Sequence, residues 1–569
     1  MHFIDKFSNK QITLACITLI GAFFLFHYTS SFDFKPDLNG DNAHYYSLAK
    51  SLLEGKGYTN IISAAETPHT HFPPGYPVFG ALVLSVFKSY LSLKIANGVL
   101  LFLSILLLFL LARRLSGSTP VALGAAVLCC MQAQLLRYGS IVMSEMLFTA
   151  LTLLALYLAS HLDPNRLFGN SRPRQVYAFI LLTGTLCYIY LVRTMGASIV
   201  LAFFLFYGLL LLRQGWSYFQ ERKANPTAET TLRAKRSCIS HLLVLAILVG
   251  AFACTKTAWD VRNRHAGSTQ SDYLKDFKRK PKGEQMATFA DWTERVQNNL
   301  LSYSAKWIPS AVLPYDYEQQ QGATSRDWGR GIIVIALMLF GLLKLHKLRL
   351  LLFLYVGVTL GVLLIWPEQY ASHRYFIGLI PLFIFLFVNG VFEALSLVAR
   401  KLSLRTTVPA GVLFVVLCFG LLPRYADSLK GMKAFAQHKT WNNRVAPEAF
   451  VEYAYAINWC KTHLPADARV ACRKSDIYYL FSGGQKAESF PQYAKPEDVF
   501  KGFKEGGITH VIIDRWFRHG YVTIYPVISK HYPECFRPLV QFGKNTETQL
   551  PTLIFEFNPN GFTKDEHDN

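Results

Sequence analysis

"ITLACITLIGAFFLFHYTSSFDFKPDLNGDNAHYY", residues 12–46, joins a long apolar run to a polar segment that carries acids, a histidine and two tyrosines. The apolar part is long enough to form most of a membrane-spanning helix, since about 20 residues cross a hydrocarbon core. A basic start precedes it and no small-residue cleavage site follows, so we expect an uncleaved first span. The polar half is either a site at the membrane surface or a solvated helix end.

The whole chain repeats this apolar character. Of its 569 residues, 51% are hydrophobic and 17% are charged, whereas soluble domains carry about a quarter charged residues. The net charge of +21 reports topology and contact with anionic membrane lipids. Because no nucleic-acid-binding motif accompanies the charge, we expect no nucleic-acid partner. The ten cysteines contain no CxxC pair, and at most one disulfide is expected among Cys460, Cys472 and Cys535.

Eleven apolar windows predict transmembrane helices. They lie near residues 11–30, 94–112, 119–136, 141–160, 176–192, 195–212, 238–257, 330–347, 349–366, 375–395 and 406–423. Lysines and arginines gather in alternate connections, as in the basic segment 213–236, while the opposite short loops hold isolated arginines. The positive-inside rule then places the N-terminus in the cytoplasm. The predicted fold class is a polytopic α-helical membrane protein.

The segment 76–90 is apolar but too short to cross the membrane easily. A full crossing would also reverse the alternation of charge, so we expect it to lie at the outer surface or to insert only partly. We expect a transmembrane domain over residues 1–425 with outer-face loops at 31–93 and 258–329. Residues 426–569 are expected to form a separate extracytoplasmic domain.

The C-terminal segment has the pattern of a small soluble α/β domain. "PEAFVEYAYAINWCKTHL" (447–464) and "KPEDVFKGFKEGG" (495–507) have the start and stop signals of helices. "ARVACR" (468–473), "THVIID" (509–514) and "TLIFEF" (552–557) are short apolar runs that predict strands. We therefore expect a few strands with helices packed on them.

A short amphipathic helix is predicted directly behind the first span. Its apolar face consists of Tyr45, Leu48, Ala49 and Leu52, at i, i+3, i+4 and i+7. Asp41 lies at the helix start, where the macrodipole favours a negative charge. It is therefore an N-cap, a site residue, or both. Asp37 is assigned to the solvated exit of the first span.

"HTHFPPGYP", residues 69–77, follows in the same loop. Its prolines stiffen the chain, and Pro77 enters the next apolar helix at its start. The motif is either a rigid turn that re-enters the membrane or part of a site that includes His71 and Tyr76. His69 and His71, two residues apart, give only a weak metal signal.

Charged residues recur at the outer ends of later spans. Glu145 falls about one turn inside an apolar span, where an ionisable group costs a few kcal/mol and predicts function. The alternative is a salt bridge that fixes helix packing. The cationic candidates on this face are Arg137, Arg193, Arg262, Arg264, His373 and Arg374. Each arginine alone can snorkel to the interface, but a cavity with several arginines suits a lipid-borne phosphate.

The order of these motifs resembles a known family. A first-loop acid with "GKGY" is followed by "PPGYP", by "SE" at a span start, by an arginine after the next hairpin, by "RN" before a long outer loop and by "RYF" at a late span. This order resembles the GT-C superfamily of integral-membrane glycosyltransferases, and most closely its dolichyl-phosphate-mannose-protein mannosyltransferase and aminoarabinose-transferase-like branch. The resemblance covers roughly residues 1–425. It implies inverting transfer of a sugar from a polyprenyl-phosphate carrier to an acceptor on the outer face.

The resemblance also implies residue roles. Asp41 would accept or orient the proton of the acceptor, Glu145 matches the second acidic position, and Arg374 is expected near the carrier phosphate. The remaining donor-phosphate or substrate-binding candidates are His71, Tyr76, Arg137, Arg193, Arg262 and His373. Aminoarabinose-transferase-like members have an acid and a lysine where this chain has His71 and Phe72. His71 or the arginines would therefore replace that lysine.

Inverting transfer needs a base on the acceptor side and charge stabilisation on the phosphate. Arginines can manage a single phosphodiester, so we expect no obligatory metal and leave a divalent metal open. The alternatives are a transporter or flippase and an assembly subunit, each handling lipid-linked saccharides. Charges at the outer ends of spans favour surface chemistry over transport. A bacterial inner membrane is the expected location, and the sequence leaves open the sugar, the carrier length and the acceptor, whether glycan, lipid or protein.

Overall fold

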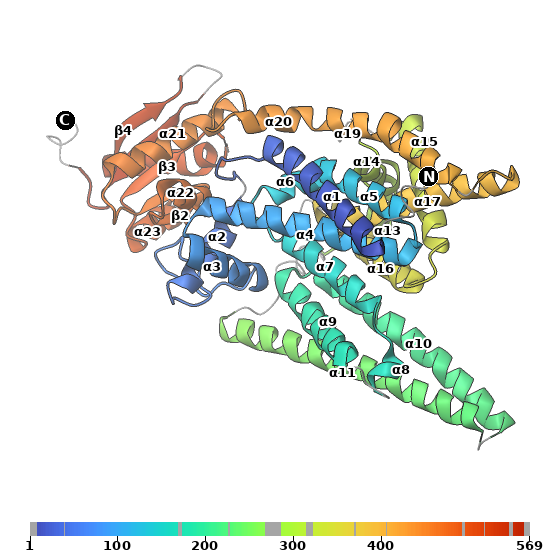
Figure 1. The fold of residues 1–569 in the computed structure, drawn as a ribbon. Coiled ribbons are helices and arrows are strands. Elements are labelled where there is room, and N and C mark those ends of the chain that lie inside the picture. Colours follow the sequence, from blue (N-terminus) through green and yellow to red (C-terminus); the bar gives the residue numbers. More distant parts are fainter. Residues whose placement is uncertain are drawn as a thin grey trace.

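The computed structural model describes residues 8–38, 40–168, 173–225, 228–267, 286–314, 323–368, 371–405, 407–491, 495–516, 518–544 and 550–562. A helical bundle makes up most of the molecule, and a small α/β unit lies at one end of it (Figure 1). The outer loop was expected at residues 258–329. Two parts of it, 268–285 and 315–322, lie outside the described residues.

The helices of the bundle include one or more for each apolar window of the sequence, together with shorter and more polar helices. They are α1 (Asn9–Ser31), α2 (Gly40–Leu53), α3 (Gly75–Phe87), α4 (Tyr90–Ser116), α5 (Thr119–Met131), α6 (Ala133–Gly139), α7 (Glu145–Ala159), α8 (Pro164–Leu167), α9 (Pro173–Val192), α10 (Gly196–Ala224), α11 (Glu229–His265), α13 (Phe289–Ser302), α14 (Ile308–Val312), α15 (Ser325–Leu343), α16 (Arg349–Ile365), α17 (Ile380–Lys401), α18 (Val408–Val415), α19 (Leu422–Ser428) and α20 (Lys430–Gln437). Short turns of other helix types interrupt them at η2 (Tyr303–Trp307), η4 (His373–Leu379) and η5 (Val416–Leu421).

Among the described residues, seven helices are long and apolar enough to cross a membrane. An eighth span results if α5 and α6, which meet at a bend of 62°, are counted together. The other predicted windows also fall on helices: α7 and α16 are shorter apolar helices, and α15 carries charged residues in its first turns. The chain is therefore a multi-pass membrane protein.

The segment predicted to lie at the surface forms α3. This helix has 13 residues and is about 20 Å long at 1.5 Å per residue, which is less than a hydrocarbon core. It packs against α2 and the start of α4. Its length therefore agrees with a segment that does not cross the membrane.

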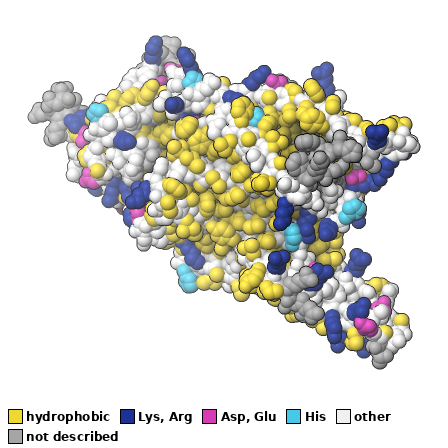
Figure 2. All heavy atoms as spheres, viewed as in Figure 1, with side chains coloured by type: hydrophobic (Ala, Val, Ile, Leu, Met, Phe, Trp, Pro, Cys, Tyr) yellow, Lys and Arg dark blue, Asp and Glu magenta, His cyan; other side chains and the backbone are white. Residues whose placement is uncertain are grey.

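The centre of the bundle is formed by α4, α5, α7 and α17, which pack on one another. Every residue from Ile380 to Gly390 of α17 is buried, as expected for a helix that is apolar all round. A Cβ at Gly390 would lie 2.0 Å from the Leu337 carbonyl oxygen, so only glycine permits α15 to approach this closely. Outside this centre, apolar side chains cover much of the visible surface (Figure 2).

The tail confirms the predicted α/β unit. It consists of α21 (Glu448–His463), β1 (Val470–Cys472), α22 (Ser475–Ser482), β2 (Ala487–Ser489), α23 (Pro496–Glu505), β3 (His510–Ile513), η6 (Gly520–Ile524), η7 (Val527–His531), η8 (Pro533–Cys535), β4 (Phe536–Phe542) and β5 (Thr552–Phe557). The strand order is β2-β1-β3-β5-β4. β1 pairs in parallel with β2 and β3, whereas β5 is antiparallel to β3 and β4.

The sequence reading predicted three of these strands and two of the helices. It did not predict β2, β4 or α22. β2 has three residues. In β4 only Phe536 is buried, and the pairing of this strand with β5 shifts register after Pro538. Such strands depend on their neighbours, since propensity in a strand reflects mainly packing. The domain boundary near residue 425 stays a prediction.

The tail lies directly against the first outer loop. α22 packs on α2, and the Ala487 amide donates to the Ile62 carbonyl at 3.0 Å. Glu488 accepts from the Ser63 hydroxyl at 2.6 Å, and Lys486 pairs with Glu66 at 2.7 Å. The tail therefore packs against both α2 and the loop that follows it.

Candidate active site

Asp41 occupies the first turn of α2, as predicted. The helix begins at Gly40, where a Cβ would lie 1.9 Å from a carboxylate oxygen of Asp476 in the tail. Glycine at this position therefore lets α22 approach the start of α2. The Asp41 side chain keeps 30% of its surface exposed, so it can meet a molecule from solution.

Four charged side chains from separate elements form one continuous network. Arg374, in the turn before α17, donates through Nη2 to Asp41 Oδ2 at 2.5 Å and through Nε to Glu145 Oε1 at 2.9 Å. Glu145 Oε1 also lies 2.7 Å from Nη1 of Arg193, which follows α9. We call these four residues the charged network. It brings together residues that are more than 300 positions apart in the chain.

One end of the charged network is exposed to solvent, and the other end is buried. The side chains of Asp41 and Arg374 are 30% and 26% exposed, whereas Glu145 is fully buried. Burial lowers the pKa of Arg193, but the charge of Glu145, the Tyr45 side chain and a hydrogen bond to Glu145 together raise it by more, so the Arg193 pKa is raised overall and its charge is kept. The network therefore offers one accessible carboxylate and one accessible guanidinium, with a buried carboxylate behind them.

Two neutral groups extend the network towards α2. Arg193 Nη1 donates to the Ser144 hydroxyl oxygen at 3.0 Å. The Ser144 and Tyr45 hydroxyls share a hydrogen bond of 3.1 Å. Sequence reasoning placed Tyr45 only on an apolar helix face and did not single out Ser144, because this contact depends on the packing of α2 against α7.

Arg262 anchors the loop that lies beside α2. It donates to the carbonyl oxygens of His69 and, at 2.9 Å, Tyr58, and its guanidinium stacks over the Tyr58 ring. His69 accepts from the Phe72 amide at 2.9 Å. Burial, with nearby positive groups that include Arg262, lowers the His69 pKa to about 3. Arg262 thus binds backbone rather than an acid, and His69 is a neutral imidazole.

The other predicted site residues lie in different surroundings. His71 is exposed with its ring against Phe72, and Tyr76 is buried with its hydroxyl accepting from Asn97 at 2.9 Å. His373 is buried beside Trp307 and shares a hydrogen bond of 2.9 Å with Ser310. Further predicted cations, Arg137 and Arg264, form no ion pair within the described part of the chain, and Arg137 is exposed. Of the predicted site residues that the structure describes, the charged network therefore unites Asp41, Glu145, Arg193 and Arg374.

The assignment of Asp37 to a solvated helix exit was wrong. Asp37 is 5% exposed and forms an ion pair with Lys94 of α4 at 3.0 Å. Burial raises the Asp37 pKa, while Lys94 and several hydrogen bonds lower it. The signal was present in the sequence, because a lysine at the start of an apolar span needs a partner, but the partner is apparent only once the connection between α1 and α2 packs against α4.

A polar pocket of about 280 Å³ lies between the first loop and the tail. Its walls include His44, Asn60, Ser63, Arg473, Lys474, Ser475, Asp476, Glu488 and Ser489. His44 lies three residues after Asp41, on the same side of α2, and its Nε2 is 4.0 Å from Asp476. The pocket therefore opens next to the accessible end of the charged network.

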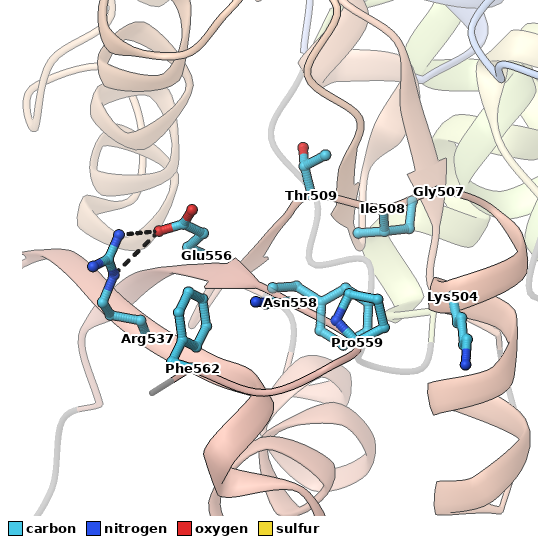
Figure 3. A pocket seen from close by; sticks show the side chains of 10 residues that line it. Lys504, Gly507, Ile508, Thr509, Arg537, Glu556, Asn558, Pro559 and Phe562 are labelled. Carbon is cyan, nitrogen blue, oxygen red and sulfur yellow. Dashed lines mark hydrogen bonds and ion pairs between the residues drawn. The ribbon is translucent and has the colours of Figure 1, made fainter. Parts of the chain in front are cut away.

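A second pocket lies on the tail sheet, away from this site (Figure 3). Lys504, Arg537, Glu556, Asn558 and Phe562 line it, and Arg537 pairs with Glu556 at 2.6 Å across β4 and β5. It contains no residue of the charged network. The pair also joins residues directly opposite in the two strands, so it stabilises the sheet.

The charged network does not have the form of a cation site. Arg374 lies between the Asp41 and Glu145 carboxylates and contacts both, so a guanidinium occupies the place that a shared metal would need. Within the described ranges, no group of three or more His, Cys, Asp or Glu residues could hold a metal. A divalent metal remains open for the substrate-bound protein.

No family model matches this chain, and no curated protein matches it by sequence. Solved structures match its fold. The apo oligosaccharyltransferase of Archaeoglobus fulgidus is 12% identical with a TM-score of 0.56, over 96% of this chain and 76% of that chain. ArnT from Cupriavidus metallidurans bound to undecaprenyl phosphate is 11% identical with a TM-score of 0.55, over 95% of this chain and 97% of that chain.

Both neighbours belong to the GT-C superfamily of membrane glycosyltransferases. The chain therefore has the GT-C fold, which confirms the fold expected from the order of its motifs. The match to ArnT spans nearly the whole of both chains, so it includes the tail as well as the membrane part. The oligosaccharyltransferase was also solved with an inhibitory peptide and a dolichol-phosphate, at a TM-score of 0.55.

Proposed function

We propose that this protein is an inverting glycosyltransferase that moves a sugar from a polyprenyl-phosphate carrier to an acceptor on the outer face of the membrane. The observation that carries the proposal is the charged network, with an accessible carboxylate and guanidinium in direct contact. The neighbours bound to undecaprenyl phosphate and to a dolichol-phosphate support the class of carrier. The proposed orientation has a cytoplasmic N-terminus, with the tail outside a bacterial inner membrane.

In this proposal Arg374 and Arg193 bind the donor phosphate and stabilise its charge. Arg374 already holds two carboxylates, and its exposed edge offers donors to phosphate oxygens, which arginine binds with two parallel hydrogen bonds. Glu145 stays buried and keeps both guanidinium groups in place. Stabilising the phosphate as it gains charge is the main electrostatic demand of the reaction.

Asp41 serves the acceptor. The acceptor oxygen or nitrogen forms a bond to the anomeric carbon on the face opposite the phosphate, and the bond between that carbon and the phosphate oxygen breaks. The carrier leaves as a polyprenyl phosphate anion, and the acceptor proton moves to the Asp41 carboxylate. A phosphate that takes up the charge of Arg374 releases Asp41 from its ion pair for this role.

The polar pocket beside His44 suits the acceptor side. Arg473 and Lys474 from the tail and Asn60 and Ser63 from the first loop supply donors and acceptors of hydrogen bonds around it. An acceptor whose polar group enters between the loop and the tail would approach Asp41 past His44, which lines the pocket one turn further along α2. The tail then takes part in acceptor binding.

The test is a transfer assay with purified protein and a panel of polyprenyl-phosphate sugars, read by mass spectrometry of cell-envelope acceptors. Asp41→Asn should lower transfer by roughly 10²–10⁴-fold, the range that general base catalysis contributes. The matched control is Asp427→Asn, because Asp427 forms an ion pair with Lys430 at 2.8 Å on the surface and is 67% exposed. The control should transfer normally.

Two results would overturn the proposal in different ways. Normal transfer by Asp41→Asn removes Asp41 from the reaction. A wild-type protein that transfers no sugar but moves a lipid-linked saccharide across proteoliposomes favours the transport alternative. Wild-type transfer with a control that behaves like Asp41→Asn would show that the assay reports general damage.

A further inference from the structure

The buried Asp37–Lys94 pair has no part in the chemistry proposed above, yet it lies beside the acids that do. Asp37 Oδ2 accepts three hydrogen bonds: from the Val142 amide at 2.8 Å, from Asn42 Nδ2 at 2.9 Å and from the Tyr90 hydroxyl at 2.6 Å. Its other oxygen faces Lys94 Nζ at 3.0 Å. Both side chains are almost wholly buried, at 5% and 0% exposure.

Two of these partners adjoin the proposed reactive carboxylates. Asn42 directly follows Asp41, and Val142 lies three residues before Glu145. Asn42 Nδ2 also donates to the Val142 carbonyl at 3.0 Å, so Asn42 and Asp37 together join the start of α2 to the segment that leads into α7. One carboxylate thus binds both the side chain of Asn42, which adjoins Asp41, and the backbone amide of Val142, which leads into α7.

Helix α4 supports the same segment at a second point. Asn97, one turn after Lys94, donates to the Met143 carbonyl at 3.1 Å, and Lys94 Nζ donates to the Lys35 carbonyl at 2.5 Å. The polar end of α4 therefore holds both the exit of α1 and the entry of α7. Burying an ion pair gives little net stability compared with apolar side chains of the same size, so stability alone does not account for this pair.

We propose that Asp37, held by Lys94, is a positioning residue that sets the separation of Asp41 and Glu145 across Arg374. The effect of this role on the reaction rate rests on the proposed function. Its effect on the positions of Asp41 and Glu145 does not. If Asp37 no longer binds Asn42 and Val142, the starts of α2 and α7 can shift relative to each other. A displacement of about 1 Å at a reacting group can cost roughly 100-fold in rate.

The variants are Asp37→Asn and Asn42→Ala, with Asp33→Asn as the matched control. Asp33 also faces Lys94, at 3.8 Å, and pairs with Lys35 at 2.7 Å. It is 8% exposed, close to the 5% of Asp37, but it contacts neither Asn42 nor Val142 in the described hydrogen-bond network. The control therefore removes a similar buried charge without releasing the acids.

The kinetic readout separates positioning from folding. Per molecule of folded protein, Asp37→Asn and Asn42→Ala should lower kcat by roughly 10–100-fold, while KM for the donor stays within about threefold, since Arg374 and Arg193 remain. Asp33→Asn should keep the wild-type kcat even if less protein folds. If Asp37→Asn does not fold, Asn42→Ala decides, because it leaves no buried charge without its partner.

Hydrogen exchange supplies a readout that needs no activity. Amides in residues 40–46 and 141–147 should both exchange faster in Asn42→Ala and keep their wild-type rates in Asp33→Asn. Unchanged kcat and exchange in the folded variants, or an equal loss in the control, would overturn the positioning role. If the wild-type protein transfers no sugar but the variants show the expected exchange pattern, the proposed function is overturned and the positioning role still holds.

Discussion

Glu145→Gln tests the buried centre of the charged network. The wild-type carboxylate is fully buried and lies 2.7 Å from Arg193 and 2.9 Å from Arg374. The substitution keeps the shape but leaves two guanidinium groups beside a neutral amide. Removing one partner of a buried ion pair costs about 3–5 kcal/mol. Because Arg374 retains Asp41, we expect the lower end, about 3 kcal/mol.

The loss can be measured as a rate. Membrane proteins in detergent usually unfold irreversibly, so stability is read as a half-life at fixed temperature. Since each 1.36 kcal/mol is a factor of ten, a loss of about 3 kcal/mol shortens the half-life by roughly 100-fold if it falls on the unfolding step. The assay is the monodisperse fraction on size exclusion after timed heating.

Glu229→Gln is the matched control for this measurement. Glu229 also pairs with an arginine, Arg233 at 2.6 Å, but its side chain is 77% exposed. Exposed pairs contribute about 0–1 kcal/mol, so the half-life of the control should fall by no more than about fivefold. A Glu145→Gln half-life within the same fivefold would refute the argument, because Arg193 and Arg374 would then be held by other groups.

Three further predictions concern the arginines and the loop. Arg374→Lys should fold but lose affinity for the donor in a transfer assay, because lysine cannot contact Asp41, Glu145 and a phosphate through one planar group. A KM for the donor equal to that of the wild type would contradict this. EDTA should leave transfer unchanged if the arginines alone serve the phosphate, and a loss restored by a divalent metal would contradict this. The His69 pKa is about 3 when folded and about 6.5 when unfolded, so the unfolded chain binds more protons between these values. The free energy of unfolding should therefore fall as pH drops below 6.5, by up to about 1.4 kcal/mol per pH unit. In His69→Asn the thermal half-life should depend less steeply on pH. An equally steep dependence in the variant would contradict this.

Local patterns in the sequence predicted the main elements of the architecture, but not β2, β4 or α22 of the tail. Apolar windows set by the thickness of a bilayer predicted the membrane helices, and turn signals around short apolar runs predicted β1, β3 and β5 of the tail. Glu145 was also recognisable, because an ionisable group inside an apolar span is costly and predicts a function, whereas Asp41 and Arg374 received their expected roles from the resemblance in motif order. These inferences depend on composition over one or two dozen residues, which a sequence displays directly.

Which charged side chains pair with one another could not be predicted in the same way. Asp37 and Asp41 are four residues apart, yet Asp37 is 5% exposed and paired with Lys94 of α4, while Asp41 keeps 30% of its side chain exposed. Arg193, Arg262 and Arg374 looked alike as arginines at span ends, but only Arg193 and Arg374 meet Glu145. Helix packing brings residues together that lie tens to hundreds of positions apart, and burial then decides which charges must be paired. Composition and motif order thus predicted a multi-pass chain with a GT-C-like fold, an α/β tail and the main charged candidates, whereas the packing of the helices determines which of these residues form one network and which hold it in place.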